Sequence, residues 1–489
     1  MTDAVPLKLF NSLTRKLEEF QPVHEGEARV YSCGPTVYNY QHIGNMRAYV
    51  FADTLGRTLQ WKGYKLTHVI NITDVGHLTS DADEGEDKME KMAAKENKSA
   101  WDIAKFYQED FERDLARLNV QPKQHPRATE YVAAMIAWGE RIADKHCYEL
   151  DSGLYFDVST VADYGRLARA VTEDGEGRID TVEGKRNAAD FAIWRKTPDG
   201  ETRQMEWDSP WGRGAPGWHL ECSVMGEALL GFPFDIHTGG IDHREIHHPN
   251  EIAQNQAYCC TNGLDDARNS GARIWMHNNF LIERSGKMSK SAGEFLRLQL
   301  LVDKGYHPLA YRLMCLQAHY RSELEFSWEG LDAALTRLKR MVMALRKWEE
   351  RLPDTDIPGD CWEYERVTRE LVERFDSAIS SDLNTADALT ILEEALALKK
   401  TAPECVVTAV EQLDRVFGLD LARLSRADLR IRPKDAQITE DEIEDALGRR
   451  KAARAEKDFA TSDAIRDELT AKGVEVMDGD PLGWEWKLG

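Results

Sequence analysis

The fold class is set by two apolar stretches, ARVYSC at residues 28–33 and KLTHVINI at residues 65–72. Both have the length and composition of short buried strands. Between them, residues 45–61 repeat apolar side chains with helical spacing, and Gly63 follows as a stop signal. A strand, a loop, a helix and a second strand within about 45 residues predict a βαβ unit with parallel strands.

The same alternation resumes later in the chain, after an interruption. We expect a helix at 218–231, a strand at 234–240 (FDIHTGG), a helix at 247–260 and a strand at 273–282 (RIWMHNNFLI). Residues 81–118 have polar, helical spacing, whereas residues from about 120 to 210 resemble loops and short strands rich in Gly, Trp and Asp. We therefore predict an α/β domain with a parallel sheet, split by an inserted module.

The chain after residue 308 has a different texture. Its apolar periodicity over 331–350 and 362–400 predicts long helices, and no convincing strand is expected before the last residues. Linkers are expected at 353–361 and at about 424–440. The end of the chain predicts one or two amphipathic helices and then a small hairpin at 474–489.

Composition limits the class of protein. The 489 residues carry 63 Lys and Arg against 85 Asp and Glu, a net charge of -22, which excludes a general DNA-coating protein but permits a local basic patch. The sequence has no run of 18 apolar residues and no secretory signal at its start, so we expect no membrane association and a cytoplasmic location. Its 8 cysteines are then expected to be thiols and not a disulfide framework.

A polar loop after the strand at 273–282 contains the string KMSKS at 287–291, bounded by Gly286 and Gly293. Two lysines and two hydroxyl groups between glycines make a mobile cationic flap, suited to a polyphosphate whose charge changes during a reaction. A solvated charged loop is the ordinary alternative, but chance poorly explains this five-residue string.

A second segment, HIGN at 42–45, lies between the first strand and the helix of the βαβ unit. Backbone N–H groups at a helix start favour anions, and Gly44 lets a ligand approach the backbone closely. Taken alone, the segment fits a helix cap or a surface histidine better than a ligand site.

Together, the two segments resemble the signatures of class I aminoacyl-tRNA synthetases, which are His-Ile-Gly-His and Lys-Met-Ser-Lys-Ser in the two halves of a split Rossmann domain. The resemblance implies that ATP is bound, and the pentavalent transition state at its α-phosphate stabilised, by His42, Gly44, Asn45, Lys287 and Lys290. Of these, His42, Asn45, Lys287 and Lys290 are expected to be catalytic. Asn45 stands where the family has its second histidine, and its side-chain amide is still a hydrogen-bond donor.

Further stretches resemble one family of these enzymes, the cysteinyl-tRNA synthetases. They run in the family's order over residues 28–330: YSCGPTVYNYQHIGN at 31–45, NITDVG at 71–76, KRNAADFAIWRK at 185–196, SPWGRGAPGWHLECSVM at 209–225, FDIHTGGIDHREIHHPNEIAQ at 234–254 and SWEG at 327–330. The helical region after 340, including SDLNTADAL at 381–389, is similar to the family's C-terminal domains. The resemblance covers nearly the whole chain.

The resemblance implies one zinc ion per chain, bound by Cys33, Cys222, His247 and Glu251. The sequence alone would not reveal this site, because it has no CxxC pair and core packing is the ordinary interpretation of each cysteine. The residue types are consistent with it, since His247 and Glu251 share a helix face and all four are ordinary zinc ligands. Zinc would bind the substrate thiol as a thiolate and so separate cysteine from serine.

Other positions match the family less specifically. Thr73, Trp218, His237 and Asp242 correspond to pocket positions, and each is expected either to bind substrate or to have a structural role.

Two features near the end of the chain are candidates for contact with tRNA. Trp484 and Trp486 either stack on anticodon bases or cap a small core. A basic helix face, either solvated or in contact with tRNA phosphates, is formed by Arg449, Arg450, Lys451 and Arg454.

The resemblance implies a specific domain organisation. A Rossmann-like catalytic domain is expected in two halves, 1–120 and 211–330, separated by a connective module at 121–210, and followed by an α-helical bundle at 331–423 and a small α+β anticodon-binding domain at 424–489.

The implied activity is activation of L-cysteine with ATP and Mg²⁺, followed by transfer of cysteine to the 3′-terminal adenosine of tRNA(Cys) by a monomeric enzyme. The cysteine ligase of mycothiol synthesis shares the catalytic motifs but joins cysteine to an amino-sugar, and the long C-terminal region favours tRNA instead. A non-catalytic nucleic-acid-binding or regulatory protein is disfavoured by the intact 287–291 string and the four zinc-ligand candidates.

Overall fold

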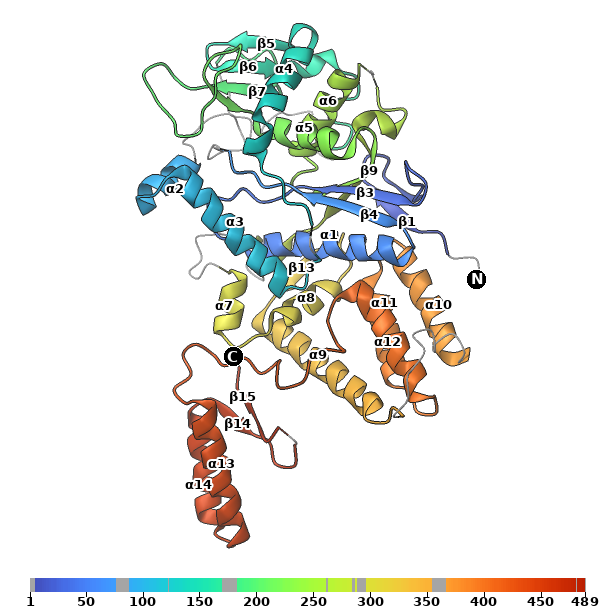
Figure 1. Ribbon diagram of the computed structural model, residues 1–489, viewed down its shortest axis with the longest axis vertical. Helices are drawn as coiled ribbons and strands as arrows, with labels where there is room; N and C mark the ends of the chain where they lie inside the picture. Colours follow the sequence, from blue (N-terminus) through green and yellow to red (C-terminus); the bar gives the residue numbers. More distant parts are fainter. Residues whose placement is uncertain are drawn as a thin grey trace.

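The structure is a computed structural model that describes residues 5–75, 88–121, 123–168, 183–260, 263–283, 286–287, 296–353, 366–480 and 482–488. Figure 1 shows a parallel sheet in the middle of the molecule, with the inserted module on one side and a helical bundle on the other. A pair of helices, α13 (Glu440–Ala455) and α14 (Phe459–Ala471), protrudes beyond the bundle. No helix of the described residues is long and apolar enough to cross a membrane.

The central sheet has four parallel strands in the order β10-β9-β3-β4. Their bounds are β3 (Glu27–Ser32), β4 (Lys65–Ile70), β9 (Phe234–Gly240) and β10 (Ala272–Asn278). Helix α1 (Ile43–Trp61) connects β3 to its neighbour β4, so the predicted βαβ unit with parallel strands is confirmed. Helices α5 (Trp218–Leu230) and α6 (His247–Cys259) also lie where the sequence predicted them.

Helix α1 is buried on all sides because it lies between the sheet and the bundle (Figure 1). Every residue from Tyr49 to Leu59 is buried. Phe51 and Leu55 pack with strand residues of the sheet, whereas Tyr49 and Val50 belong to the core that continues into the bundle. The sheet and the bundle are therefore joined through one continuous core.

A buried charge cluster joins these two parts. The carboxylate of Asp53 accepts hydrogen bonds from Arg57 Nε at 2.6 Å and Arg312 Nη2 at 2.7 Å, and Lys123 Nζ lies 3.3 Å away. The Arg312 guanidinium also donates to the carbonyl of Phe417, at the end of the bundle helix α12 (Pro403–Phe417). Burial favours the neutral acid, but the three cations together lower the pKa of Asp53 below its ordinary value.

Replacing Asp53 with asparagine is expected to destabilise the protein by about 3–5 kcal/mol, because three cations would lose their shared counter-charge without gaining water. Urea unfolding followed by circular dichroism measures the change. Glu370→Gln is a matched control, since its partner Arg366 is exposed and such pairs contribute about 0–1 kcal/mol. Equal stability of the two variants would show that the cluster does not stabilise the fold.

The inserted module contains a four-stranded antiparallel sheet in the order β5-β6-β7-β8. Its elements are α4 (Val132–His146), β5 (Cys147–Leu150), β6 (Gly153–Phe156), β7 (Phe191–Lys196) and β8 (Gly214–Pro216). The expectation of loops and short strands alone was wrong, because Val132, Met135, Trp138 and Ile142 give α4 a regular buried face. Strand β8 also extends this sheet past residue 210.

The stretch expected as one strand at 273–282 is broken. Strand β10 ends at Asn278, and a separate strand β11 (Leu281–Glu283) pairs with β12 (Gly286–Lys287) and β13 (Leu324–Phe326). The break is held by Arg47, whose Nη1 donates to the Asn279 carbonyl at 2.9 Å. Strand β13 also corrects the expectation that no strand occurs between 308 and the end of the chain.

The remaining elements are mostly helical. They are the hairpin β1 (Lys8–Asn11) and β2 (Lys16–Glu19), helices α2 (Lys88–Glu96) and α3 (Ala100–Arg117) between the first half of the sheet and the inserted module, and α7 (Leu298–Asp303), α8 (Pro308–Leu316), α9 (Trp328–Glu349), α10 (Arg366–Ser380) and α11 (Thr385–Leu396). Of the expected linker at 353–361, all but the first residue lies outside the described residues.

The end of the chain forms a small separate core, which we call the tail. It comprises α13 (Glu440–Ala455), α14 (Phe459–Ala471), β14 (Val474–Val476) and β15 (Trp484–Trp486), and the two strands pair antiparallel as the expected hairpin. The residues between α12 and α13 contain neither helix nor strand, as expected of a linker, but Leu429 within them packs in the bundle core. The tail core begins at Ile438.

Candidate active site and metal centre

A cavity of about 430 Å³ opens at the carboxyl ends of the central strands, where ligand sites of parallel α/β sheets are found. Its wall comes from the loop between β3 and α1, the start of α5, the turn after β9 and the turn after β10. The four predicted zinc ligands lie at one end of this wall or just behind it, and the 42–45 segment lies at the start of α1.

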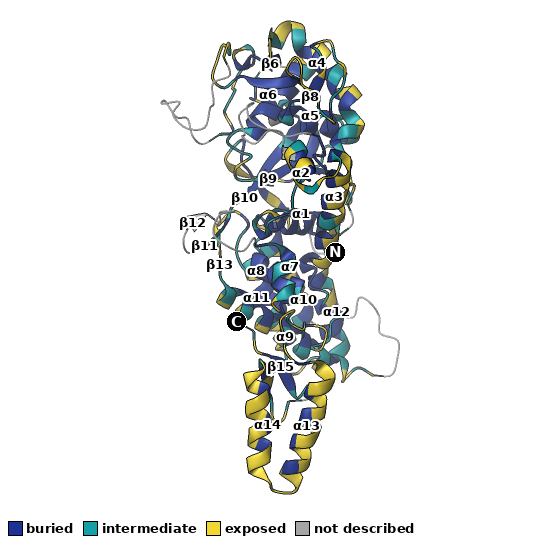
Figure 2. Ribbon diagram, turned by 90° about the vertical axis from the view of Figure 1, so that its left-hand side faces the viewer, coloured by how far each residue is buried: buried dark blue, intermediate teal, exposed yellow. Residues whose placement is uncertain are grey.

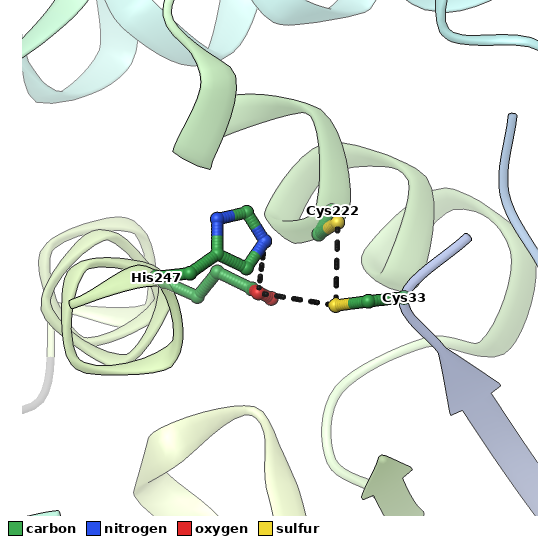
Figure 3. A group of neighbouring side chains, drawn as sticks. Cys33, Cys222 and His247 are labelled. Carbon is green, nitrogen blue, oxygen red and sulfur yellow. Dashed lines mark hydrogen bonds and ion pairs between the residues drawn. The ribbon is translucent and has the colours of Figure 1, made fainter. Parts of the chain in front are cut away.

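Cys33, Cys222, His247 and Glu251 converge, and one ligand atom from each lies within 4.8 Å of all the others. Figure 3 shows the three labelled side chains pointing toward one another from the end of β3, from α5 and from α6. The Sγ atoms of Cys33 and Cys222 are 4.0 Å apart, and His247 Nε2 lies 3.0 Å from Glu251 Oε1. The structure therefore brings together the whole predicted ligand set.

The four side chains of this cluster shift one another's pKa values. Burial raises the pKa of Cys33, and the hydrogen bond from its thiol lowers the pKa of Cys222 to about 6. Burial disfavours charge on His247 and Glu251, but their attraction outweighs it, raising the pKa of His247 to about 10 and helping to lower that of Glu251 to about 2. With both thiols deprotonated and His247 neutral, the set would carry two thiolates and a carboxylate. Such a set of ligands suits a soft divalent cation.

A second combination of donors is also close enough to bind a metal, namely Cys33, His237, His248 and Glu251. His248 Nε2 lies 3.3 Å from Cys33 Sγ. Neither His237 nor His248 lines the cavity, whereas Cys33, Cys222 and His247 all do. The first combination therefore has three donors at the cavity wall, whereas the second has only Cys33 there.

His237 is not among the residues that line the cavity, and its contacts fit the structural alternative of the two roles that were expected for it. It is buried, stacks on Trp275 with ring centroids 4.5 Å apart, and its Nε2 lies 2.8 Å from Glu251 Oε2. It therefore fixes the orientation of the Glu251 carboxylate, whose other oxygen, Oε1, points toward His247.

Further histidines behind the cluster were not predicted. His219 Nδ1 lies 2.9 Å from His247 Nδ1, and His248 Nδ1 lies 2.8 Å from His277 Nε2. The sequence offered one signal for a histidine behind the cluster, namely the adjacent pair His247 and His248. Consecutive helix residues point in different directions, so only one of the two can face the metal site. The other histidines are brought there by separate elements, which sequence spacing does not reveal.

Three of the expected substrate residues line the cavity, namely Thr73, Trp218 and Asp242. The Thr73 hydroxyl donates to the buried carboxyl of Glu221 at 2.8 Å, so its side chain is fixed from behind. Trp218 begins α5, and its ring centroid lies 4.4 Å from that of His247. Asp242 is an exposed acid at the cavity edge.

The 42–45 segment forms the start of α1 and also lines the cavity. His42 caps the helix, because its Nδ1 accepts the backbone N–H of Gly44 at 3.1 Å. The side-chain amide of Asn45 donates to Gln41 Oε1 at 3.0 Å. The helix-cap interpretation is therefore confirmed for His42, which also lines the cavity.

The lysines of the 287–291 string are only partly described. The backbone of Lys287 belongs to β12, opposite Ile282, and Lys290 lies outside the described residues. The chain is described again from Leu296, whose carbonyl accepts the backbone N–H of Ile43 at 2.8 Å. The described chain therefore resumes beside the start of α1.

The two tryptophans that were candidates for contact with tRNA lie inside the tail. Trp484 and Trp486 are buried in the tail core, and Trp484 Nε1 donates to Glu444 at 2.7 Å. Stacking of these two rings on bases is therefore wrong for the folded tail, and the alternative of a small core is confirmed. An exposed aromatic ring is instead offered by Phe459, which begins α14 and is 60% exposed.

The basic face of α13 is also less open than its sequence suggested. Arg450 is buried and forms two hydrogen bonds with Asp478, which Arg454 shares at 2.8 Å. Arg449 pairs with Asp445 at 3.1 Å. Asp478 lies in the turn between β14 and β15, far along the chain, so its neutralising effect was not visible in the spacing of the arginines. Lys451 is exposed.

Comparison with known families covers most of the chain. The catalytic-domain family described as "tRNA synthetases class I (C) catalytic domain" matches residues 19–336, and the "Cysteinyl-tRNA ligase anticodon binding domain" matches residues 439–481. A protein of Novosphingobium aromaticivorans named "Cysteine--tRNA ligase" is 75% identical over 99% of this chain and 98% of its own length. A protein of the same name from Zymomonas mobilis subsp. mobilis is 52% identical over 99% and 98%.

Solved structures share the fold at low sequence identity. The Mycobacterium tuberculosis methionyl-tRNA synthetase bound by methionyl-adenylate has a TM-score of 0.52 and 14% identity, over 80% of this chain and 89% of that one. The LeuRS of Agrobacterium radiobacter K84, in a ternary complex with tRNA and LeuAMS, has a TM-score of 0.54 and 12% identity, over 82% and 84%. The chain belongs to the cysteinyl-tRNA synthetase family of class I aminoacyl-tRNA synthetases.

Proposed function

We propose that this chain is a cytoplasmic, monomeric cysteine–tRNA ligase that converts L-cysteine and ATP to cysteinyl-adenylate and transfers the cysteine to the 3′-terminal adenosine of tRNA(Cys). The observation that carries the proposal is the set of two thiols, an imidazole and a carboxylate at one end of a cavity whose wall also includes the start of α1. The family and the names of its full-length relatives support it.

The thiol end of cysteine is assigned to Cys33, Cys222, His247 and Glu251. Bound there, Zn²⁺ would take the substrate thiolate as a further ligand and favour sulfur over the hydroxyl of serine. His237 keeps Glu251 oriented, and Glu221 keeps Thr73 oriented. Asp242 and Trp218 are placed to receive the rest of the amino acid, with the carboxylate of Asp242 attracting its ammonium group.

The nucleotide end is assigned to His42, Gly44 and Asn45, with Lys287 and Lys290 on ATP that is bound with Mg²⁺. The backbone N–H groups at the start of α1 favour phosphate. No protein nucleophile is required, because the carboxylate of cysteine attacks the α-phosphate and releases pyrophosphate. The protein contributes the relative placement of the two substrates and the cations that stabilise the developing charge.

The cysteine ligase of mycothiol synthesis remains the second candidate, because the same catalytic residues would activate cysteine for an amino-sugar acceptor. The tail favours tRNA, since residues 439–481 match an anticodon-binding family. Two assays test the proposal in sequence. Cysteine-dependent ATP–pyrophosphate exchange separates an enzyme from a binding protein, and cysteine transfer to tRNA or to an amino-sugar then identifies the acceptor. Absence of exchange, or transfer to the amino-sugar alone, would overturn the proposal.

Removing the tail is expected to leave cysteine activation intact and to weaken tRNA binding. The boundary follows the structure: a chain ending at Asp435 keeps Leu429 in the bundle core and omits the tail core that begins at Ile438. Loss of base stacking and phosphate contacts should also make tRNA binding less dependent on salt concentration. Filter binding at several salt concentrations measures the affinity and its slope.

Phe459→Ala is a second test of the tail, and it is expected to lower tRNA affinity less than the truncation does. Figure 2 shows the pair α13–α14 protruding from the rest of the molecule, and Phe459 begins α14 directly after the turn from α13. Loss of one stacked base corresponds to about 1–3 kcal/mol. Leu17→Ala is the control, since that side chain is 53% exposed on β2, in another part of the chain. Unchanged tRNA charging by the truncated chain would show that the tail is a stabilising cap.

A further inference from the structure

An aromatic surface leads from the cavity to the exposed side of α3. Tyr40 lines the cavity, and its ring centroid lies 6.2 Å from that of Phe106 and 5.1 Å from that of Tyr107. Tyr107 is buried, whereas Phe106 is 38% exposed. Burying Phe106 further would be favourable, yet the fold leaves this ring in contact with water beside the active site.

Two cations lie over the faces of these rings. The Arg297 guanidinium is 4.3 Å from the centroid of Tyr40, and Lys98 Nζ is 5.0 Å from the centroid of Phe106. Lys98 is also paired with Glu96 at 2.9 Å, whereas Arg297 follows the 287–291 string and precedes α7. We call Tyr40, Phe106, Arg297 and Lys98 the aromatic platform.

Aromatic rings combined with cations suit single-stranded nucleic acid. Bases stack on ring faces and on the guanidinium plane whatever their sequence, and the cations attract the phosphates between them. Trp101, also on α3, is another exposed ring of this helix, since it is 46% exposed and its ring centroid lies 6.4 Å from that of Trp207. Figure 1 shows α2 and α3 along the outside of the catalytic domain, between the inserted module and the bundle.

The proposed reaction requires a single-stranded ligand at this place. The 3′-terminal adenosine must enter the cavity to receive cysteine, so the nucleotides before it must cross the surface at the cavity's edge. Tyr40 belongs both to the cavity wall and to the platform, which makes the two continuous. We infer that the aromatic platform binds the unpaired 3′-terminal nucleotides of the tRNA and guides the terminal adenosine into the cavity; this inference rests on the proposed function.

The test compares Phe106→Ala with the full-length wild-type chain in aminoacylation. The KM for tRNA is expected to rise about 10-fold, the effect of losing one stacked base, while cysteine-dependent ATP–pyrophosphate exchange stays unchanged. Phe106→Trp should restore the wild-type KM, because it restores a stacking surface. Leu17→Ala, which removes an exposed apolar side chain on β2, should leave both values unchanged.

Binding of tRNA lacking its unpaired 3′-terminal nucleotides separates this role from a structural one. Wild type should bind the shortened tRNA more weakly than intact tRNA, and Phe106→Ala should bind both with the same reduced affinity. An unchanged KM in Phe106→Ala, or a loss of affinity that is equally large for the shortened tRNA, would overturn the inference. Loss of exchange in the variant would likewise overturn it, and failure of the wild type to charge any tRNA would instead refute the proposed function.

Discussion

Replacing Lys290 with alanine is expected to slow formation of cysteinyl-adenylate by about 10²-fold or more, the effect of removing one preorganised electrostatic group. Cysteine binding should change much less, because the lysine is expected to act on charge that develops only in the transition state. Single-turnover formation of the adenylate, with enzyme in excess over cysteine, measures the rate constant directly.

The described residues on each side of the string support this placement. Strand β12 ends at Lys287 and pairs with β11, and Leu281 at the start of β11 lines the cavity. On the other side, Leu296 is hydrogen-bonded to Ile43 in the first turn of α1. The described chain therefore contacts the cavity before the string, at Leu281, and the start of α1 after it, at Leu296.

A matched control separates this effect from a general loss of positive charge. Lys347→Ala removes an exposed lysine from α9 in the bundle and should leave the rate constant unchanged. Lys290→Arg should retain part of the activity, because it keeps the charge but changes its position. If Lys290→Ala forms the adenylate with the wild-type rate constant, Lys290 has no part in the mechanism.

Replacing Cys222 with serine is expected to remove most of the bound zinc and most of the preference for cysteine over serine. An alcohol is a much weaker zinc ligand than a thiolate, and Cys222 is the group of the cluster whose pKa is lowered to about 6. Removal of a residue that only supports a ligand lowers metal affinity by roughly 10–100-fold, and the loss of metal affinity in Cys222→Ser should be larger than that. Metal analysis of the purified protein checks the first effect, and exchange with each amino acid checks the second.

Two further variants make this prediction specific. His237→Ala should lower zinc affinity by about 10–100-fold, because Glu251 loses the partner that orients it. Cys315→Ser is the control, since Cys315 is a buried thiol of α8 outside both donor combinations. A full zinc content in Cys222→Ser and in Cys33→Ser would contradict the four-ligand site.

The regular parts of the catalytic domain could be predicted from sequence because their signals are local. Strand periodicity and a glycine stop identified β3, α1 and β4, and the parallel order then followed from the helical connection. The broken strand after Asn278 could not be predicted, because the break depends on Arg47, far away in the sequence. The same limit hid β13, whose partner is β11.

The candidate site shows the same division. Family resemblance predicted a ligand set that the fold brings together, although Cys33 and Cys222 are far apart in sequence. It left the role of His237 open, because a residue that faces the cavity and one that supports a ligand from behind have the same sequence signal. Trp484 was open to two interpretations for a related reason: an aromatic residue near the end of a chain looks the same whether it covers a core or meets a base.

Cysteine-dependent ATP–pyrophosphate exchange, measured on the wild-type chain before and after removal of its metal, tests the central claim most directly. Zinc-loaded protein is expected to catalyse exchange with cysteine and barely with serine, metal-free protein should lose the cysteine-dependent exchange, and added Zn²⁺ should restore it. Equal exchange with cysteine by loaded and metal-free protein, or equal use of serine by the loaded protein, would contradict the account.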